Sequence, residues 1–302
     1  MASRGRVKPL QPGTSSPHDG HFTVKVRLLE TGERFSVAGC SQRMKVGELK
    51  EKLELLAGIP KNLQTLSHLD DGDLPDSSTF KFNGIFPGAK LSLSVWPYDG
   101  LTDLIQFAAT GNLAKLIGVG VSPDSSFNTE NSLRLNMKQK KEWLAARSGL
   151  ALYVASHRGH LHVIRFLLQN GCNVRYKTHL GNTPLHAAAA TGKYDCIDEL
   201  LANGAQMQDT NGEGHTALDV ARVCGHKKVE RRLFFFQWEE RAANLSIKRH
   251  LDPSELFAHQ KHDSKLKTWL NGSHAKRYMS NLIPFQEFQG SHLSAPPKRN
   301  PV

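Results

Sequence analysis

The chain has 302 residues, of which 39% are hydrophobic and 22% are charged. These values suit a globular protein with room for two domains, and they exclude a wholly disordered chain. The formal net charge of +11 favours acidic partners. No segment comes near the ~20 consecutive apolar residues of a membrane helix, and the first residues lack the apolar core of a secretory signal.

The four cysteines predict neither a disulfide framework nor a metal centre. No two of them form a C-x-x-C pair, and no signal peptide precedes them. We therefore expect free thiols and a protein of the cytoplasm or nucleus, with no metal site and no cofactor. The cysteines are Cys40, Cys172, Cys196 and Cys224.

The first hundred residues predict a small mixed sheet with one helix. Residues 1–20 are rich in Gly, Pro, Ser and Thr and are expected to form a disordered arm. Alternating apolar and polar residues over 22–28 predict a strand, and the turn at 31–33 predicts a hairpin partner over 34–38. Apolar spacing over 44–57 predicts a helix.

Two further strands complete this part. Gln64 to Leu69 and Leu91 to Val95 have the composition of short strands. The segment from Trp96 to Gly100 then breaks the pattern and marks a boundary. A helix across a small sheet buries these faces economically.

The region from Phe22 to Val95 resembles the ubiquitin-like family. The resemblance rests on Thr31-Gly32, on Gly58-Ile59-Pro60 after the helix, and on Leu74-Pro-Asp76…Thr79-Phe80. It implies an α+β β-grasp domain over 21–97.

Two departures from ubiquitin bear on function. The last strand runs into Trp96-Pro97 instead of a diglycine tail, so conjugation through this domain is not expected. The aliphatic recognition patch of ubiquitin is replaced by polar residues. Receptors that bind ubiquitin by burying apolar surface should therefore bind this domain more weakly. The replaced positions are Glu30, Ser67 and Ser94.

A 33-residue period follows, and it is the strongest signal in the chain. Gly159, Gly192 and Gly225 keep this interval, and several leucines and alanines keep the same register. The middle unit contains T-P-L-H at 183–186 and L-L-A-N-G-A at 200–205. It resembles the ankyrin repeat, which implies that the sheet domain is followed in the chain by an all-α solenoid of stacked helix pairs.

The repeats are predicted over 100–240. A degenerate unit covers 100–120, an insertion covers 121–147, and repeats cover about 148–177, 178–210 and 211–240. Residues 241–302 are expected to form a basic tail that is partly packed and ends in disorder.

The ankyrin resemblance implies a protein partner, bound by the hairpin tips and the concave inner-helix face. By register, eight residues are expected to be exposed there. They are His157, Arg158, His179, Leu180, Asn182, Thr191, Glu213 and His215.

Catalysis is not expected, because hydrolase, zincin and phosphate-loop motifs are absent from the sequence. His157, His160 and His162 cluster, but Gly159-His160 is a common ankyrin turn, so we interpret them as structural. The favoured hypothesis is a monomeric adaptor for an unidentified, acidic protein partner, without a small-molecule substrate.

Two alternatives stay open. One is a ubiquitin or proteasome pathway factor that uses the ubiquitin-like domain. The other is a nucleic-acid or anionic-membrane binder that uses the basic segment from Arg134 to Arg147, although that segment lacks the interleaved aromatics of single-strand binders.

Overall fold

The computed structural model describes residues 20–69 and 72–247, with side chains as far as residue 240. The N-terminal sheet region and the helix pairs form one compact unit that ends at Phe236, and a second unit begins at Gln237. The predicted disordered arm and nearly all of the predicted basic tail lie outside the described residues.

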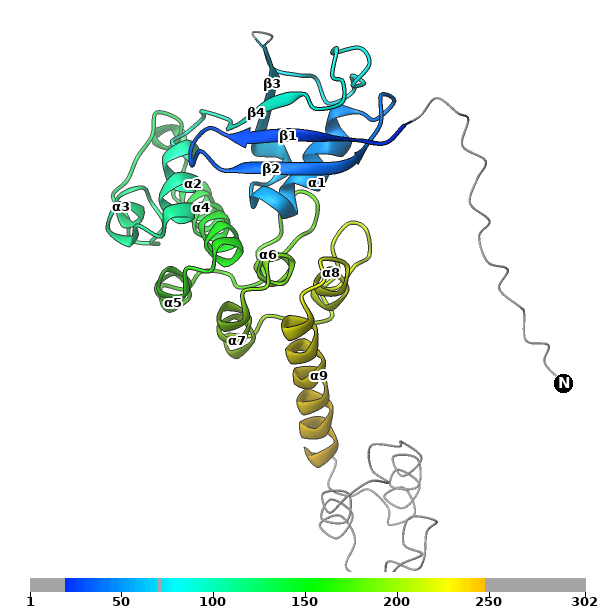
Figure 1. Cartoon of the computed structure of the whole chain (residues 1–302). Coiled ribbons are helices and arrows are strands. Elements are labelled where there is room, and N and C mark those ends of the chain that lie inside the picture. The colour runs from blue at the N-terminus through cyan, green and yellow to red at the C-terminus, as the bar shows by residue number, and fades with distance from the viewer. Residues whose placement is uncertain (1–19, 70–71, 248–302) are drawn as a thin grey trace, which may run out of the picture. The chain divides into compact units, whose positions relative to one another are not determined.

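The N-terminal sheet region contains four strands in the order β2-β1-β4-β3. The central strands β1 and β4 are parallel, and each has an antiparallel neighbour. Figure 1 shows helix α1 lying against one face of this sheet. The arrangement is compatible with a β-grasp fold. The elements are β1 (Phe22–Leu28), β2 (Arg34–Cys40), α1 (Val46–Ala57), the 3-10 turn η1 (Lys61–Leu63), β3 (Gln64–His68) and β4 (Lys90–Val95).

Helix α1 ends as its sequence predicts. Gly58 takes the left-handed conformation (φ 71°), and its N–H donates to the carbonyl of Glu54. Ile59 is buried at 1% exposure, and Pro60 precedes the next turn. Gly58 therefore directs the chain back toward the core.

Four helix pairs follow among the described residues. The first helices of successive pairs pack on one another, from α2 through α4 and α6 to α8, and α5 packs on α7. This is the stacking of ankyrin repeats, as the 33-residue period predicts. The pairs are α2 (Leu101–Thr110) with α3 (Leu113–Gly118), α4 (Met137–Arg158) with α5 (Leu161–Gln169), α6 (Pro184–Thr191) with α7 (Tyr194–Ala202), and α8 (Ala217–Val223) with α9 (Lys227–Ile247).

Two observed helix ends differ from the predicted boundaries. Helix α4 begins at Met137, so the second half of the predicted insertion is helical. Asn136 and Gln139 form a capping box at its start, and helix-forming Lys, Gln and Glu residues follow. Helix α9 continues past 240 to Ile247, because no Gly or Pro interrupts it.

The insertion packs on the helix pairs through a buried arginine. The guanidinium carbon of Arg147 lies 4.9 Å from the ring centre of Phe127 and 4.7 Å from that of Trp143. Arg147 also donates to the carbonyls of Val119 (2.7 Å) and Asp99 (2.7 Å). Burial lowers the pKa of Arg147. These contacts hold Phe127 against α4, and the 3-10 turn η2 (Ser132–Arg134) follows Phe127 in the chain.

The turn glycines show why this position of the repeat is occupied by glycine. A Cβ added at Gly192 would lie 2.7 Å from Nδ1 of His226, and His226 Nε2 donates to the carbonyl of Ala190 at 2.9 Å. The same relation joins Gly111 to His160 two repeats earlier. Each glycine thus has a positive φ and also leaves room for a side chain of the next pair.

We predict that Gly192→Ala lowers the free energy of unfolding by about 2–3 kcal/mol, because backbone strain adds to displacement of the His226 ring. Gly171→Ala is the matched control. Gly171 also has a positive φ (77°), but no atom lies within 4 Å of the added Cβ. Gly171→Ala should lower the free energy of unfolding only by the backbone strain, about 1–2 kcal/mol. Equal losses in urea denaturation would contradict this account.

Candidate functional site

Helix α1 contacts the concave side of the repeats, where it packs on α6. Its fully buried Glu54 accepts three hydrogen bonds. Oε1 accepts from Thr178 Oγ1 (2.5 Å) and Asn182 Nδ2 (2.8 Å), while Oε2 accepts from the N–H of Lys61 (2.7 Å). A buried carboxylate needs such donors to offset its desolvation. We call this interface the α1 contact.

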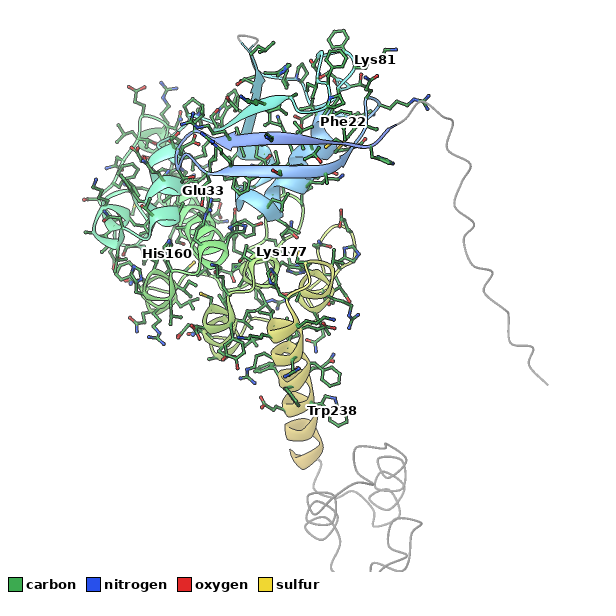
Figure 2. All side chains as sticks on the ribbon, viewed as in Figure 1. Phe22, Glu33, Lys81, His160, Lys177 and Trp238 are labelled. Carbon is green, nitrogen blue, oxygen red and sulfur yellow. The ribbon has the colours of Figure 1, made fainter. Side chains whose placement is uncertain are left out.

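Two adjacent residues at the end of α4 extend the α1 contact. His157 Nε2 donates to the carbonyl of Leu55 at 2.9 Å. Arg158 donates to Glu33 Oε1 at 2.5 Å and to the carbonyl of Ala57 at 3.0 Å. Glu33 lies on the side of the sheet region that faces the helix pairs (Figure 2). The last carbonyls of α1, which lack partners within the helix, are thus satisfied by the repeats.

The structure divides the eight predicted partner-binding residues into two groups. His157 and Asn182 are each only 3% exposed, and Arg158 is half-buried, because α1 covers them. Thr191 is also half-buried, and its hydroxyl donates to the carbonyl of His157 at 2.8 Å. The expectation that these four face solvent is therefore wrong for His157 and Asn182.

The other four residues gather on two adjoining hairpin tips. The N–H of Gly212 donates to the carbonyl of Leu180 at 2.8 Å, which joins the tips through their backbones. Asn211 also donates to Asn182 at 3.1 Å. His179, Glu213 and His215 are exposed and Leu180 is half-buried, whereas Asn182 and Asn211 are buried between the tips. We call this the tip surface; its predicted members are His179, Leu180, Glu213 and His215.

Sequence reasoning missed Glu33, Glu54 and Thr178. Glu54 follows Leu53 directly and flanks the apolar face of α1, so its burial depends on a surface more than 100 residues away. The sequence predicts that Gly58 takes a positive φ, but it does not predict that Gly58 lies next to His157. A Cβ there would lie 2.5 Å from the His157 ring.

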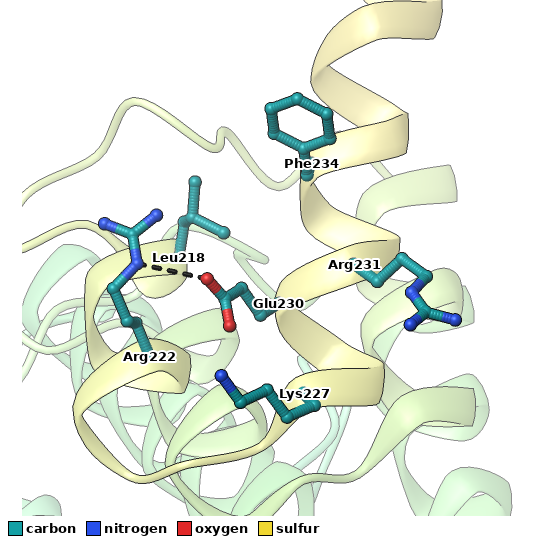
Figure 3. Close-up of a pocket in the computed structure, with 6 residues that line it drawn as sticks. All are labelled: Leu218, Arg222, Lys227, Glu230, Arg231 and Phe234. Carbon is teal, nitrogen blue, oxygen red and sulfur yellow. Dashed lines mark hydrogen bonds and ion pairs between the residues drawn. The ribbon is translucent and has the colours of Figure 1, made fainter. Parts of the chain in front are cut away.

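A hollow of about 220 Å³ lies between α8 and the first turns of α9 (Figure 3). Arg222 Nε donates to Glu230 Oε1 across it at 3.1 Å. The volume is below the ~300–1,000 Å³ of typical ligand pockets. The hollow is therefore smaller than a typical small-molecule site, and we assign it no ligand. Its lining residues are Leu218, Arg222, Lys227, Glu230, Arg231 and Phe234.

Within the described residues, no group of three or more His, Cys, Asp or Glu side chains is placed to hold a metal ion. The Nε2 atoms of His160 and His162 bond backbone carbonyls of the preceding pair, at Ala109 and Gly111. None of the helices described combines the length and apolar composition that a membrane span requires. Arg147, at one end of the basic segment, is only 2% exposed and cannot reach a phosphate.

Glu54 is expected to be the strongest single contribution to the α1 contact. Glu54→Ala leaves the donors on Thr178, Asn182 and Lys61 without their acceptor. Since each buried donor without a partner costs about 1–3 kcal/mol, the free energy of unfolding should fall by about 3–5 kcal/mol. Glu51→Ala is the control, because Glu51 forms only an exposed ion pair with Lys61 and should change stability by about 0–1 kcal/mol. Similar losses in the two variants would contradict the assignment.

Burial lowers the pKa of His157 from 6.5 to about 4, and the neighbouring Arg158 cation adds to this shift. The folded state then binds fewer protons than the unfolded state between these values. Stability is therefore complete above about pH 6.5 and falls by about 3 kcal/mol as the pH drops to about 4.

His157→Gln should flatten this pH slope, whereas the exposed His162→Gln should not. Burial also lowers the pKa of His186, so part of the slope should persist. Urea denaturation from pH 4 to 7.5 measures the effect. A slope that is unchanged in His157→Gln would contradict the prediction.

Comparison with known proteins agrees with the stacked geometry. The family model described as ankyrin repeats (3 copies) matches residues 129–211 and 152–240. Protein phosphatase 1 regulatory subunit 12A of Rattus norvegicus is 37% identical over 98 residues, which cover 29% of this chain and 10% of that protein. The "Probable E3 ubiquitin-protein ligase XBOS34" of Oryza sativa subsp. japonica is 40% identical over 96 residues, covering 30% and 18%.

Both of these proteins are matched over a small part of their length. Ankyrin repeat domain-containing protein 37 of Mus musculus is matched far more completely. It is 31% identical over 124 residues, which cover 41% of this chain and 72% of the relative. The chain belongs to the ankyrin-repeat family.

Proposed function

We propose that this chain is a non-catalytic adaptor that binds a protein partner through the tip surface. The observation that carries the proposal is the exposure of His179, Glu213 and His215 on two hairpins joined by Gly212 and Leu180. Bonds between the tips fix the backbone, so a partner meets a preorganised surface at low entropic cost. The ankyrin-repeat relatives support a role in protein–protein interaction.

We further propose that residues 21–97 form a ubiquitin-like domain beside repeats over 100–240. The sheet order and the left-handed Gly58 support this assignment. The net charge of +11 supports an acidic partner. The four free thiols support the expected location in the cytoplasm or nucleus.

The second candidate is a factor in ubiquitin handling. The name of the rice relative, a probable E3 ubiquitin-protein ligase, is the observation that favours it. The residues at the former recognition patch weigh against it. Glu30 Oε1 accepts from the N–H of Val95 at 2.6 Å, and Ser67 and Ser94 are half-buried polar residues. This surface therefore lacks the apolar area that receptors bury. A pull-down of proteasomal receptors with the full chain distinguishes the two functions.

Proximity labelling in cells tests the adaptor proposal. The double variant His179→Ala/Glu213→Ala should reduce labelling of specific neighbours about tenfold, because the loss of one or two interface contacts removes about 1.4 kcal/mol or more of binding energy. Asp195→Ala is the matched control, because Asp195 is exposed on the outer helix α7, away from the tips. An unchanged neighbour set in the tip variant would contradict the proposal.

A further inference from the structure

The hydrogen bonds of the α1 contact are one-sided. The repeats supply the donors, on Thr178, Asn182, His157 and Arg158, and the sheet region supplies the acceptors. The acceptors are one fully buried carboxylate, one half-buried carboxylate and two carbonyls from the last turn of α1. The repeats therefore present an array that fits an acidic helix end.

The spacing of the acceptors defines what this array recognises. Glu54 stands four residues before Gly58, and the carbonyls of Leu55 and Ala57 lie between them. Glutamate reaches Thr178 and Asn182. Glycine is required at the helix end, because any Cβ there would lie 2.5 Å from the His157 ring. The pattern is Glu-x-x-x-Gly at the C-terminal turn of a helix.

The same face of α4 carries polar atoms that α1 leaves unmatched. The hydroxyls of Tyr153 and Ser156 and Nδ1 of His157 have no hydrogen-bond partner among the described residues. These residues are 0%, 0% and 3% exposed, and their three- and four-residue spacing places them on one helix face. Buried polar atoms without partners oppose the closed arrangement. The acceptors of α1 are thus paired with donors of the repeats, whereas the neighbouring polar atoms of α4 are left without partners.

We propose that the concave face is a binding site for a helix ending in Glu-x-x-x-Gly, that α1 occupies it within the closed chain, and that a partner protein with such an acidic helix end binds by displacing α1. This site deepens the proposed adaptor function and rests on it. The partner gains the contacts now made by Glu54 and the end of α1. Its acidic character fits the net positive charge of the chain.

A peptide of residues 45–61 is the probe, carrying fluorescein and a lactam between Glu48 and Lys52. Both of these side chains are exposed in the chain, so the bridge leaves the binding face free. Two full-length variants open the site without changing it. Gly58→Ala wedges α1 away from His157, and Glu33→Ala/Glu54→Ala removes the two carboxylate acceptors. Near-ultraviolet circular dichroism checks that each opened chain remains folded.

The peptide should bind an opened chain at least about tenfold more tightly than the wild type, since the closed chain has few free sites. Peptides with Glu54→Ala or Gly58→Ala should lose at least about tenfold in affinity for the opened chain. Adding Asn182→Ala to the opened chain should also weaken binding. With two opened variants, the test survives the misfolding of either one.

Equal peptide affinity for wild-type and opened chains would overturn displacement. Affinity that survives Glu54→Ala and Gly58→Ala in the peptide would overturn recognition of the helix end. Neither result depends on the tip surface. If labelling still requires His179 and Glu213 while the peptide fails, the adaptor function stands and this site falls.

Discussion

The arrangement of this chain depends on the burial of one carboxylate, that of Glu54. An ionised carboxylate in a protein interior is costly unless donors surround it. Here Thr178 and Asn182 supply two donors from the repeats, and Lys61 supplies a third from the sheet region. The sheet region and the repeats therefore share one polar centre, consistent with the single compact unit that both occupy.

The repeats themselves depend on a second constraint, the packing of each turn beneath the next pair. His226 covers Gly192 and His160 covers Gly111, and each ring bonds a carbonyl of the pair below. The glycine and the histidine are thus parts of one contact. This explains why the histidines cluster near the turns, and it gives a structural reason for a pattern that resembles a metal site in the sequence.

The sequence predicted the elements well because their causes are local. Alternation in Phe22 to Leu28, the capping box of Thr183 and the glycine after α1 act within a few residues. The extension of α4 to Met137 could have been read from Asn136 and Gln139, which form a recognisable cap. The order of strands and helix pairs followed from these signals.

The candidate site was predicted only in part, because its causes are not local. The register of the repeats places His157 and Asn182 on the concave side, but nothing in the repeat motif indicates what covers that side. The residues that do so, Glu33 and Glu54, belong to a different region more than 100 positions away. Helix α1 of the same chain therefore covers the concave surface at which the ankyrin resemblance predicts another protein.

The most direct test of this account is a zero-length carbodiimide crosslink across the α1 contact. In the Arg158→Lys variant, the new amine faces Glu33, whose carboxylate lies 2.5 Å from the native guanidinium. Mass spectrometry of the monomer should find an isopeptide bond between positions 158 and 33, and this bond should disappear when Glu33→Gln is added. A monomer that forms no such bond, while exposed lysines react normally, would contradict the closed arrangement.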